Sequence, residues 1–371
     1  MNSNVIDNSS GMYETLNTTS LGDDSFLVQP NTTCELHESW YWIYAYQPIY
    51  MWTVFVIGFI ENIFVLAVFL LHKKHCTVAE IYLGNLAAAD LLFVCSLPFW
   101  AINVTNKFHW PFGGFLCIFI SALIQLNLYG SIYFLLMVSV DRYLALVKTM
   151  SFGRMRTVGW AKSSSLIIWV FAVIASMPKT IFRRLRYMPE FNATACVIDP
   201  PSQNWHIASS TLLTVLGLLL PITVISFCSF HIVKILRSNS MQEYKDVNKE
   251  KKASVLVLAV LLAFLICWLP FHVVSFLDIL HMVGVFQSCN AVNFLELANQ
   301  ISTYLGYSNS CINPLLYVMV GNHFRKKAKE VFLQFQTRRK RGRNASIPTD
   351  FSADTIRTSI SMEPQKNMIK I

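Results

Sequence analysis

Charged side chains are scarce in this chain. They make up 14% of its 371 residues, while hydrophobic residues make up 54%, and a soluble domain carries about 25% charged residues. The shortage is concentrated in long runs, and no Asp, Glu, Lys or Arg occurs from Phe108 to Val140. This distribution excludes a water-soluble globular protein and indicates segments that lie in lipid.

Seven apolar runs are long enough to cross a bilayer as helices, because about 20 apolar residues span its hydrocarbon core. Strands are excluded, since the runs are continuous and do not alternate. The sequence therefore predicts an all-α membrane protein, a seven-transmembrane helix bundle. The runs cover residues 49–71, 79–102, 114–147, 163–182, 206–236, 253–277 and 292–320.

Basic residues are missing from residues 1–47, although six acidic residues stand there. They return in every second loop and in the C-terminal segment, and loops rich in Lys and Arg stay cytoplasmic. We therefore expect a plasma-membrane protein with an extracellular N-terminus and a cytoplasmic C-terminus. One loop breaks the trend by placing bases on the outer side: Lys179, Arg183, Arg184 and Arg186.

The same pattern predicts four regions. They are an extracellular glycosylated segment (1–47), the bundle (48–320), a short amphipathic eighth helix (321–336) and a disordered cytoplasmic tail (337–371). The basic cluster of the tail is expected to meet the lipid bilayer and not nucleic acid. The predicted glycosylation sites are Asn8, Asn17, Asn31 and Asn192. The predicted phosphorylation sites are Ser346, Thr358, Ser359 and Ser361.

Cysteine, at nine residues, is too sparse for a disulfide scaffold. Four cysteines are extracellular in this topology and allow three pairings. We favour Cys117–Cys196, which ties the third run to the second outer loop, and Cys34–Cys289, which ties the N-terminal segment to the third outer loop. Four free thiols in an oxidising compartment are the alternative.

A few polar residues lie at membrane depth, where such residues face the bundle interior and mark function. One carboxylate among amide and hydroxyl oxygens suits an allosteric Na⁺ ion. The alternative is a hydrogen-bond network between helices, with water and no ion. No other cofactor and no structural metal is expected. The residues are Asp90, Asn127, Ser131, Asn309 and Asn313.

Two opposite charges adjoin where the third run ends, in Asp141-Arg142-Tyr143. Their position predicts that they lie at the inner membrane boundary. Glu250, at the start of the sixth run, is the expected ion-pair partner of Arg142, and breaking that pair would free the inner end of the sixth run. A solvated surface carboxylate is the alternative for Glu250, because exposed pairs contribute only about 0–1 kcal/mol.

Prolines mark the sixth and seventh runs. Pro270 removes a backbone hydrogen bond near Trp268, so the kinked sixth helix can adopt two packings and act as a switch. The seventh run closes with a second proline motif that contains Asn313, Pro314 and Tyr317.

These features together resemble the rhodopsin-like (class A) G-protein-coupled receptors, over residues 49–329. The resemblance implies a seven-helix receptor that signals to a heterotrimeric G protein. One departure is Ser229, which stands where many relatives have a tyrosine. The matching residues are Asn62, Asp90, Cys117, Asp141-Arg142-Tyr143, Trp169, Pro221, Cys267-Trp268-Leu269-Pro270 and Asn313-Pro314-Leu315-Leu316-Tyr317.

Longer stretches, at residues 76–85, 141–150 and 357–361, resemble the bradykinin (kinin) receptors and in particular their type-2 group. This resemblance implies an extracellular kinin peptide as ligand. It also implies coupling mainly through Gq/11, phospholipase C and calcium, and desensitisation by receptor kinases and arrestin. The tail departs from the pattern because no cysteine follows Cys311.

Two acids at the outer ends of the sixth and seventh runs, Asp278 and Glu296, resemble the pair that receives the cationic end of the peptide in type-2 kinin receptors. A solvated rim is the alternative. Arg183 follows Phe182 as in those receptors, and is the candidate partner of the peptide carboxylate. Helical phase predicts an aromatic-rich pocket below, although aromatic residues that face lipid are as common. Its expected lining is Trp100, Ile124, Gln125, Phe271, His272, Gln300, Tyr304 and Tyr307.

Other functions find little support in the sequence. No internal repeat indicates a transporter or channel. No nucleophile with a base and no metal-ligand spacing at depth indicates an enzyme. The remaining alternative is a class A receptor for another cationic peptide.

Overall fold

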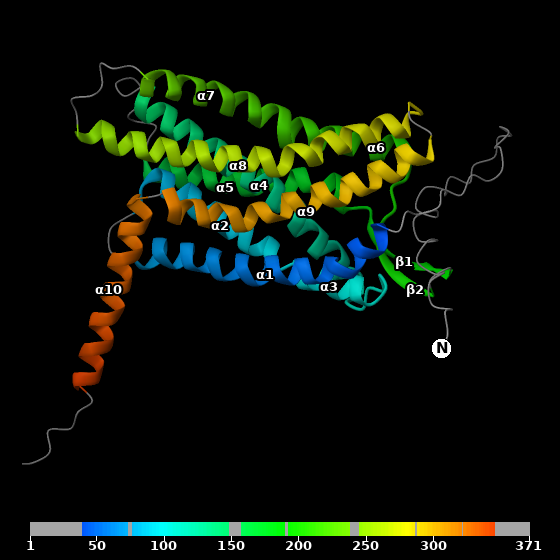
Figure 1. Ribbon diagram of the computed structural model, residues 1–371, viewed down its shortest axis with the longest axis horizontal. Helices are drawn as coiled ribbons and strands as arrows, with labels where there is room; N and C mark the ends of the chain where they lie inside the picture. Colours follow the sequence, from blue (N-terminus) through cyan, green and yellow to red (C-terminus); the bar gives the residue numbers. More distant parts are fainter. Residues whose placement is uncertain are drawn as a thin grey trace, which may run out of the picture.

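The structure is a computed structural model that describes residues 39–72, 76–147, 157–189, 192–237, 245–285, 288–320 and 322–345. Helices dominate this part of the chain, and one short hairpin is the only sheet described (Figure 1). The elements are α1 (Ser39–Leu71), α2 (Val78–Val94), α3 (Leu97–Thr105), α4 (Gly113–Val147), α5 (Val158–Thr180), β1 (Arg183–Met188), β2 (Ala193–Ile198), α6 (Gln203–Thr214), η4 (Val215–Leu219), α7 (Leu220–Arg237), α8 (Lys245–Met282), α9 (Cys289–Val320) and α10 (Asn322–Ala345).

The long helices lie side by side in one bundle (Figure 1). α4 packs against α2, α5, α7 and α8, while α9 packs against α1 and α8. Polar contacts join neighbours as well, since the indole nitrogen of Trp169 on α5 donates to the amide oxygen of Asn85 on α2, at 2.9 Å. The β1–β2 hairpin lies at one end, here called the hairpin end, and α10 lies at the opposite end, called the α10 end.

Six helical stretches of the described chain are long and apolar enough to cross a membrane: Ala45–Leu71, Val78–Thr105, Gly113–Ala145, Val158–Thr180, Gln203–Ile235 and Leu258–Met282. α9 is not among them, although it has the length and packs within the bundle as a seventh helix. Its inward face carries buried polar residues such as Ser302, Asn309 and Asn313. The predicted all-α, seven-helix membrane bundle is confirmed, with the hairpin as an addition that was not predicted.

Prolines explain two irregularities. The second span breaks at Cys95 and Ser96, immediately before Pro98 enters the first turn of α3. The fifth span contains the π-helical segment η4 just before Pro221, whose missing N–H cannot bond the preceding turn. The hydroxyl of Tyr133 on α4 donates to the carbonyl of Leu216 there, at 3.1 Å.

The hairpin is antiparallel and pairs Arg183 with Ile198 and Leu185 with Cys196. Cys196 forms a disulfide with Cys117 near the start of α4, as predicted. The backbone N–H of Trp110 adds a hydrogen bond to the carbonyl of Thr194, at 2.8 Å. These contacts hold the hairpin over the hairpin end of the bundle. Cys289 is also disulfide-bonded, while its predicted partner Cys34 lies outside the described residues.

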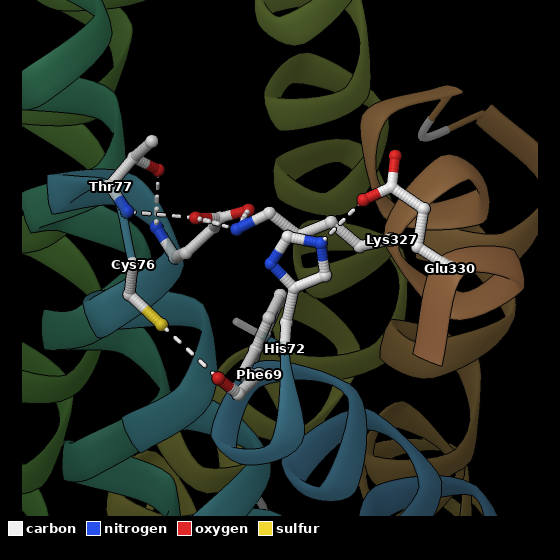
Figure 2. Close-up of polar contacts among 7 residues, drawn as sticks. Phe69, His72, Cys76, Thr77, Lys327 and Glu330 are labelled. Carbon is white, nitrogen blue, oxygen red and sulfur yellow. Dashed lines mark hydrogen bonds and ion pairs between the residues drawn. The ribbon is translucent and has the colours of Figure 1, made fainter. Parts of the chain in front are cut away.

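α10 is longer than expected. It extends to Ala345, so the prediction that regular structure ends at 336 does not hold for residues 337–345. The helix projects away from the bundle (Figure 1), and its first turns are held by polar contacts. Figure 2 shows His72, after α1, facing Glu330 of α10, with 2.8 Å between Nε2 and Oε2.

One carboxylate connects α10 to the start of α2. The side chain of Glu80 accepts from the backbone N–H of Thr77 at 2.7 Å and completes a capping box for α2. The ammonium of Lys327 on α10 lies 2.8 Å from each oxygen of the same carboxylate, and both side chains are buried (Figure 2). Glu80 therefore caps α2 and pairs with α10 at once.

Candidate functional site

A cavity of about 120 Å³ opens between the helices beneath the hairpin. Five elements contribute to its wall: α4, the last turn of α5, the hairpin, α8 and α9. The lining residues are Ser121, Ile124, Gln125, Leu128, Lys179, Thr180, Arg183, Ile198, Trp268, Phe271, Thr303 and Tyr307. The wall combines apolar and aromatic surface with a few polar groups, as ligand pockets do.

Arg183 is the principal charged group of this cavity. Its guanidinium donates to the carbonyl of Cys196 at 3.1 Å and lies over the ring of Trp100, 5.6 Å from the centroid. Burial lowers the pKa of Arg183 to about 10, an effect that Tyr307 opposes, so the guanidinium stays protonated at neutral pH. A fixed, partly desolvated cation of this kind suits a carboxylate.

Five of the predicted ligand residues come together here: Ile124, Gln125, Arg183, Phe271 and Tyr307. Trp100 reaches the cavity only through its contact with Arg183. Three others do not line it: His272, Gln300 and Tyr304. His272 is 1% exposed and packs against η4, where a Cβ on Gly217 would lie 3.3 Å from its ring.

Asp278 and Glu296 lie at the hairpin end of α8 and α9, outside this cavity. Both side chains are half-buried. Asp278 interacts electrostatically with Lys179, which lines the cavity. The arrangement separates an acidic rim from a cationic interior.

Sequence reasoning missed several lining residues: Ser121, Leu128, Lys179, Thr180, Ile198 and Thr303. Helical spacing could have identified the two on α4, because Ser121, Ile124, Gln125 and Leu128 follow an i, i+3, i+4, i+7 pattern. Lys179 was noticed as an outer base but given no role. Nothing in the sequence marks Ile198 as a wall residue.

Trp268 of α8 packs closely against Gly306 of α9. A Cβ on Gly306 would lie 3.0 Å from Cζ3 of Trp268. The indole also contacts the rings of Phe264 and Phe271, at 6.2 and 5.8 Å between centroids. Because Trp268 of α8 lines the cavity and packs against α9, a ligand that displaces it would alter the packing of α8 on α9.

Asp90 is the centre of a buried network nearer the α10 end. Its Oδ1 accepts from Asn127 at 2.8 Å, Ser131 at 3.3 Å and Ser310 at 2.8 Å. Its Oδ2 accepts from Asn313 at 3.0 Å. Three of the four donors were predicted at this site, and Ser310 was missed.

The same region suits either alternative raised by the sequence. Four protein donors satisfy Asp90 directly, which favours a hydrogen-bond network. Yet the amide oxygens of Asn62, Asn309 and Asn313 are buried and have no hydrogen-bond partner in the described part of the chain. Unpartnered oxygens of this kind suit water molecules or a Na⁺ ion.

Arg142 lies folded onto its neighbour at the α10 end of α4. Its Nε donates to Oδ2 of Asp141 at 3.1 Å and its Nη2 donates to the same oxygen, with both side chains buried. Tyr143 packs against the rings of Phe227 and His231 on α7. The guanidinium of Arg142 is therefore a buried cation within the bundle, paired with the carboxylate next to it in the sequence.

Several predicted residues cannot be compared in the same way. The side chains of Glu250 and Tyr317 lie outside the part of α8 and α9 whose side chains are described. Outside the described residues altogether are Asn8, Asn17, Asn31, Cys34, Ser346, Thr358, Ser359 and Ser361. Asn192 is exposed at the hairpin turn, where its amide oxygen accepts from the hydroxyl of Tyr187 at 2.7 Å.

The family model of the seven-transmembrane receptors (rhodopsin family) matches residues 61–317. The chain belongs to this family. Membership places the protein among receptors and not among enzymes.

Three relatives show which receptors within the family the chain is similar to. The chain is 52% identical to the B2 bradykinin receptor of Homo sapiens over 326 residues, which cover 87% of this chain and 83% of the human protein. It is 51% identical to the B2 bradykinin receptor of Rattus norvegicus over 334 residues, covering 90% and 84%. It is 38% identical to the B1 bradykinin receptor of Homo sapiens over 309 residues, covering 82% and 88%. The similarity is therefore greater to the B2 than to the B1 protein.

Proposed function

We propose that this protein is a plasma-membrane receptor for bradykinin-like (kinin) peptides. The observation that carries the proposal is similarity at about half of all positions, over most of the chain, to proteins named B2 bradykinin receptor. The cavity geometry supports it, because a cationic interior beneath an acidic rim suits a peptide with a free carboxylate and a cationic amino-terminal end. Arg183 would bind the carboxylate, and Asp278 and Glu296 the cationic end.

The orientation proposed from the charged loops places the hairpin end outside the cell and the α10 end in the cytoplasm. Peptide would then enter from the hairpin end, and a heterotrimeric G protein of the Gq/11 class would bind at the α10 end. Phospholipase C and calcium release would follow. Receptor kinases acting on Ser346, Thr358, Ser359 and Ser361 would recruit arrestin.

A panel of kinin peptides tests the ligand. Cells that express the chain should release calcium in response to a kinin and show no response to a scrambled peptide. Untransfected cells are the control for endogenous receptors. Silence to every kinin, together with a response to a different cationic peptide, would favour the alternative of another class A peptide receptor.

The switch at the α10 end yields a second prediction. In the proposed mechanism agonist shifts packing at Trp268, the inner end of α8 moves outward, and Arg142 leaves Asp141 and Glu250. Glu250→Ala should therefore raise basal calcium signalling by about two- to fivefold, because it removes the proposed anionic partner of Arg142, and this change corresponds to a shift of about 0.4–1 kcal/mol between the two packings. Unchanged basal signalling at normal surface expression would remove the Arg142–Glu250 pair from the mechanism.

A further inference from the structure

The charged side chains that line the cavity are all of one sign. None of the lining residues is acidic, and two are cationic, Lys179 and Arg183. Two further donors, the hydroxyl of Ser121 and the indole nitrogen of Trp268, are buried and have no hydrogen-bond partner in the described part of the chain. Their side chains belong to residues that are only 5% and 4% exposed. Buried donors beside two cations are matched by an anion, because leaving them unpaired is costly.

Lys179 differs from Arg183 because its ammonium has no hydrogen-bond partner in the described part of the chain. It stands in the last turn of α5, beside Thr180, whose hydroxyl is already satisfied by the carbonyl of Ser176 at 2.7 Å. No hydrogen bond or ion pair joins the Lys179 ammonium to any other side chain in the described ranges. Asp278 acts on it only electrostatically and does not line the cavity.

Lys179 and Arg183 both line the cavity, so their like charges repel each other there. Arg183 donates a hydrogen bond to the carbonyl of Cys196 and lies over the ring of Trp100. Lys179 has no comparable contact in the described part of the chain. A carboxylate placed between them would replace this repulsion with two charge-assisted hydrogen bonds. A neutral amide in the same position would offer an oxygen to one cation and an N–H₂ group to the other.

We propose that Lys179 and Arg183 together hold the free C-terminal carboxylate of the peptide, and that Lys179 sets the preference of this receptor for the free acid over the C-terminal amide. The inference rests on the proposed function, in which Arg183 alone had that role. A basic side chain on the last residue of the peptide would meet two like charges here. That side chain therefore points away from the cavity, toward the rim that carries Asp278.

Competition binding with a kinin and with its C-terminal amide tests the role of Lys179. In the wild-type receptor the free acid binds more tightly than the amide. Lys179→Met keeps the length of the side chain and removes the charge. It should weaken binding of the free acid about tenfold, or about 1.4 kcal/mol, and change binding of the amide less than about twofold. Lys179→Arg should keep the preference.

Arg184→Met is the matched control. It removes a nearby base, on strand β1, whose side chain is 61% exposed and paired with Asp199 at 2.7 Å. Both peptides should bind this variant as they bind the wild type. Surface expression is measured throughout, and Lys179→Gln replaces Lys179→Met if the latter does not reach the surface.

Two results would overturn the inference alone: equal weakening of acid and amide by the charge-removing variant, or no weakening of either. A wild-type receptor that binds acid and amide equally would do the same. Failure of the wild type to bind any kinin is a different result, because it removes the proposed function first.

Discussion

Cys117→Ser and Cys196→Ser are each expected to abolish high-affinity peptide binding. The disulfide is the covalent tie between α4 and β2, and β1 and β2 supply Arg183 and Ile198 to the cavity wall. Cys196 pairs with Leu185, two residues from Arg183. Losing a disulfide of this kind costs about 3 kcal/mol, which corresponds to a loss of about a hundredfold in affinity if the hairpin leaves its place.

The double variant should lose no more than either single variant, because all three break the same bond. Cys95→Ser, at a free and half-buried cysteine, is the control and should bind normally. Radioligand binding at matched surface expression is the measurement. Full affinity in the double variant would mean that the remaining contacts of the hairpin, such as the Trp110–Thr194 hydrogen bond, are sufficient to place Arg183.

Asp90→Ala is expected to give the largest loss of stability. It would leave four buried donors without their acceptor, and each unsatisfied buried group costs about 1–3 kcal/mol. A net loss of at least about 3 kcal/mol corresponds to a fall of about 4 °C or more in the apparent melting temperature of detergent-solubilised receptor, because a chain of 371 residues has an unfolding entropy of about 0.8 kcal/mol/K. Surface expression should fall with it.

Asp90→Asn should be much milder and is the matched comparison. Its single oxygen can still accept from Asn127, Ser131 and Ser310, and the amide of Asn313 can turn its unpartnered oxygen toward the new N–H₂ group. Equal stability of wild type and Asp90→Ala would contradict the network. Adding NaCl in place of a larger monovalent salt distinguishes the two alternatives, since only an ion site makes the wild type, and not Asp90→Ala, more stable in Na⁺.

The bundle itself was predictable because charge and hydropathy act at the scale of whole helices. Runs without charge must lie in lipid, and the few polar residues within them must face inward, so Asp90 and its amide partners could be grouped without coordinates. Ser310 was not predicted as a donor to Asp90, because a single hydroxyl beside Asn309 forms no distinctive sequence pattern. Conversely, Asn309 was expected to bond within this group, yet neither of its amide atoms has a hydrogen-bond partner among the residues that the structure describes.

The cavity was less predictable, because its wall depends on small rotations and on backbone outside the helices. Phe271 and His272 are adjacent in sequence, but only Phe271 lines the cavity, while His272 packs against the space left by Gly217 in η4. The hairpin was overlooked since a segment rich in bases has the composition of a loop. The sequence does not distinguish Lys179 from those bases, because its role depends on the end of α5 lying beside Arg183 in the cavity wall.

Glu80 both caps α2 and pairs with α10, so the order of the first turn of α2 depends on the position of α10. The same carboxylate caps the second span and holds the buried ammonium of Lys327. A partner that separates α10 from the bundle must therefore remove Lys327 from that carboxylate, and the first turn of the second span would lose order in response. Separation of α10 from the bundle and loss of order in the first turn of α2 are thus expected to occur together.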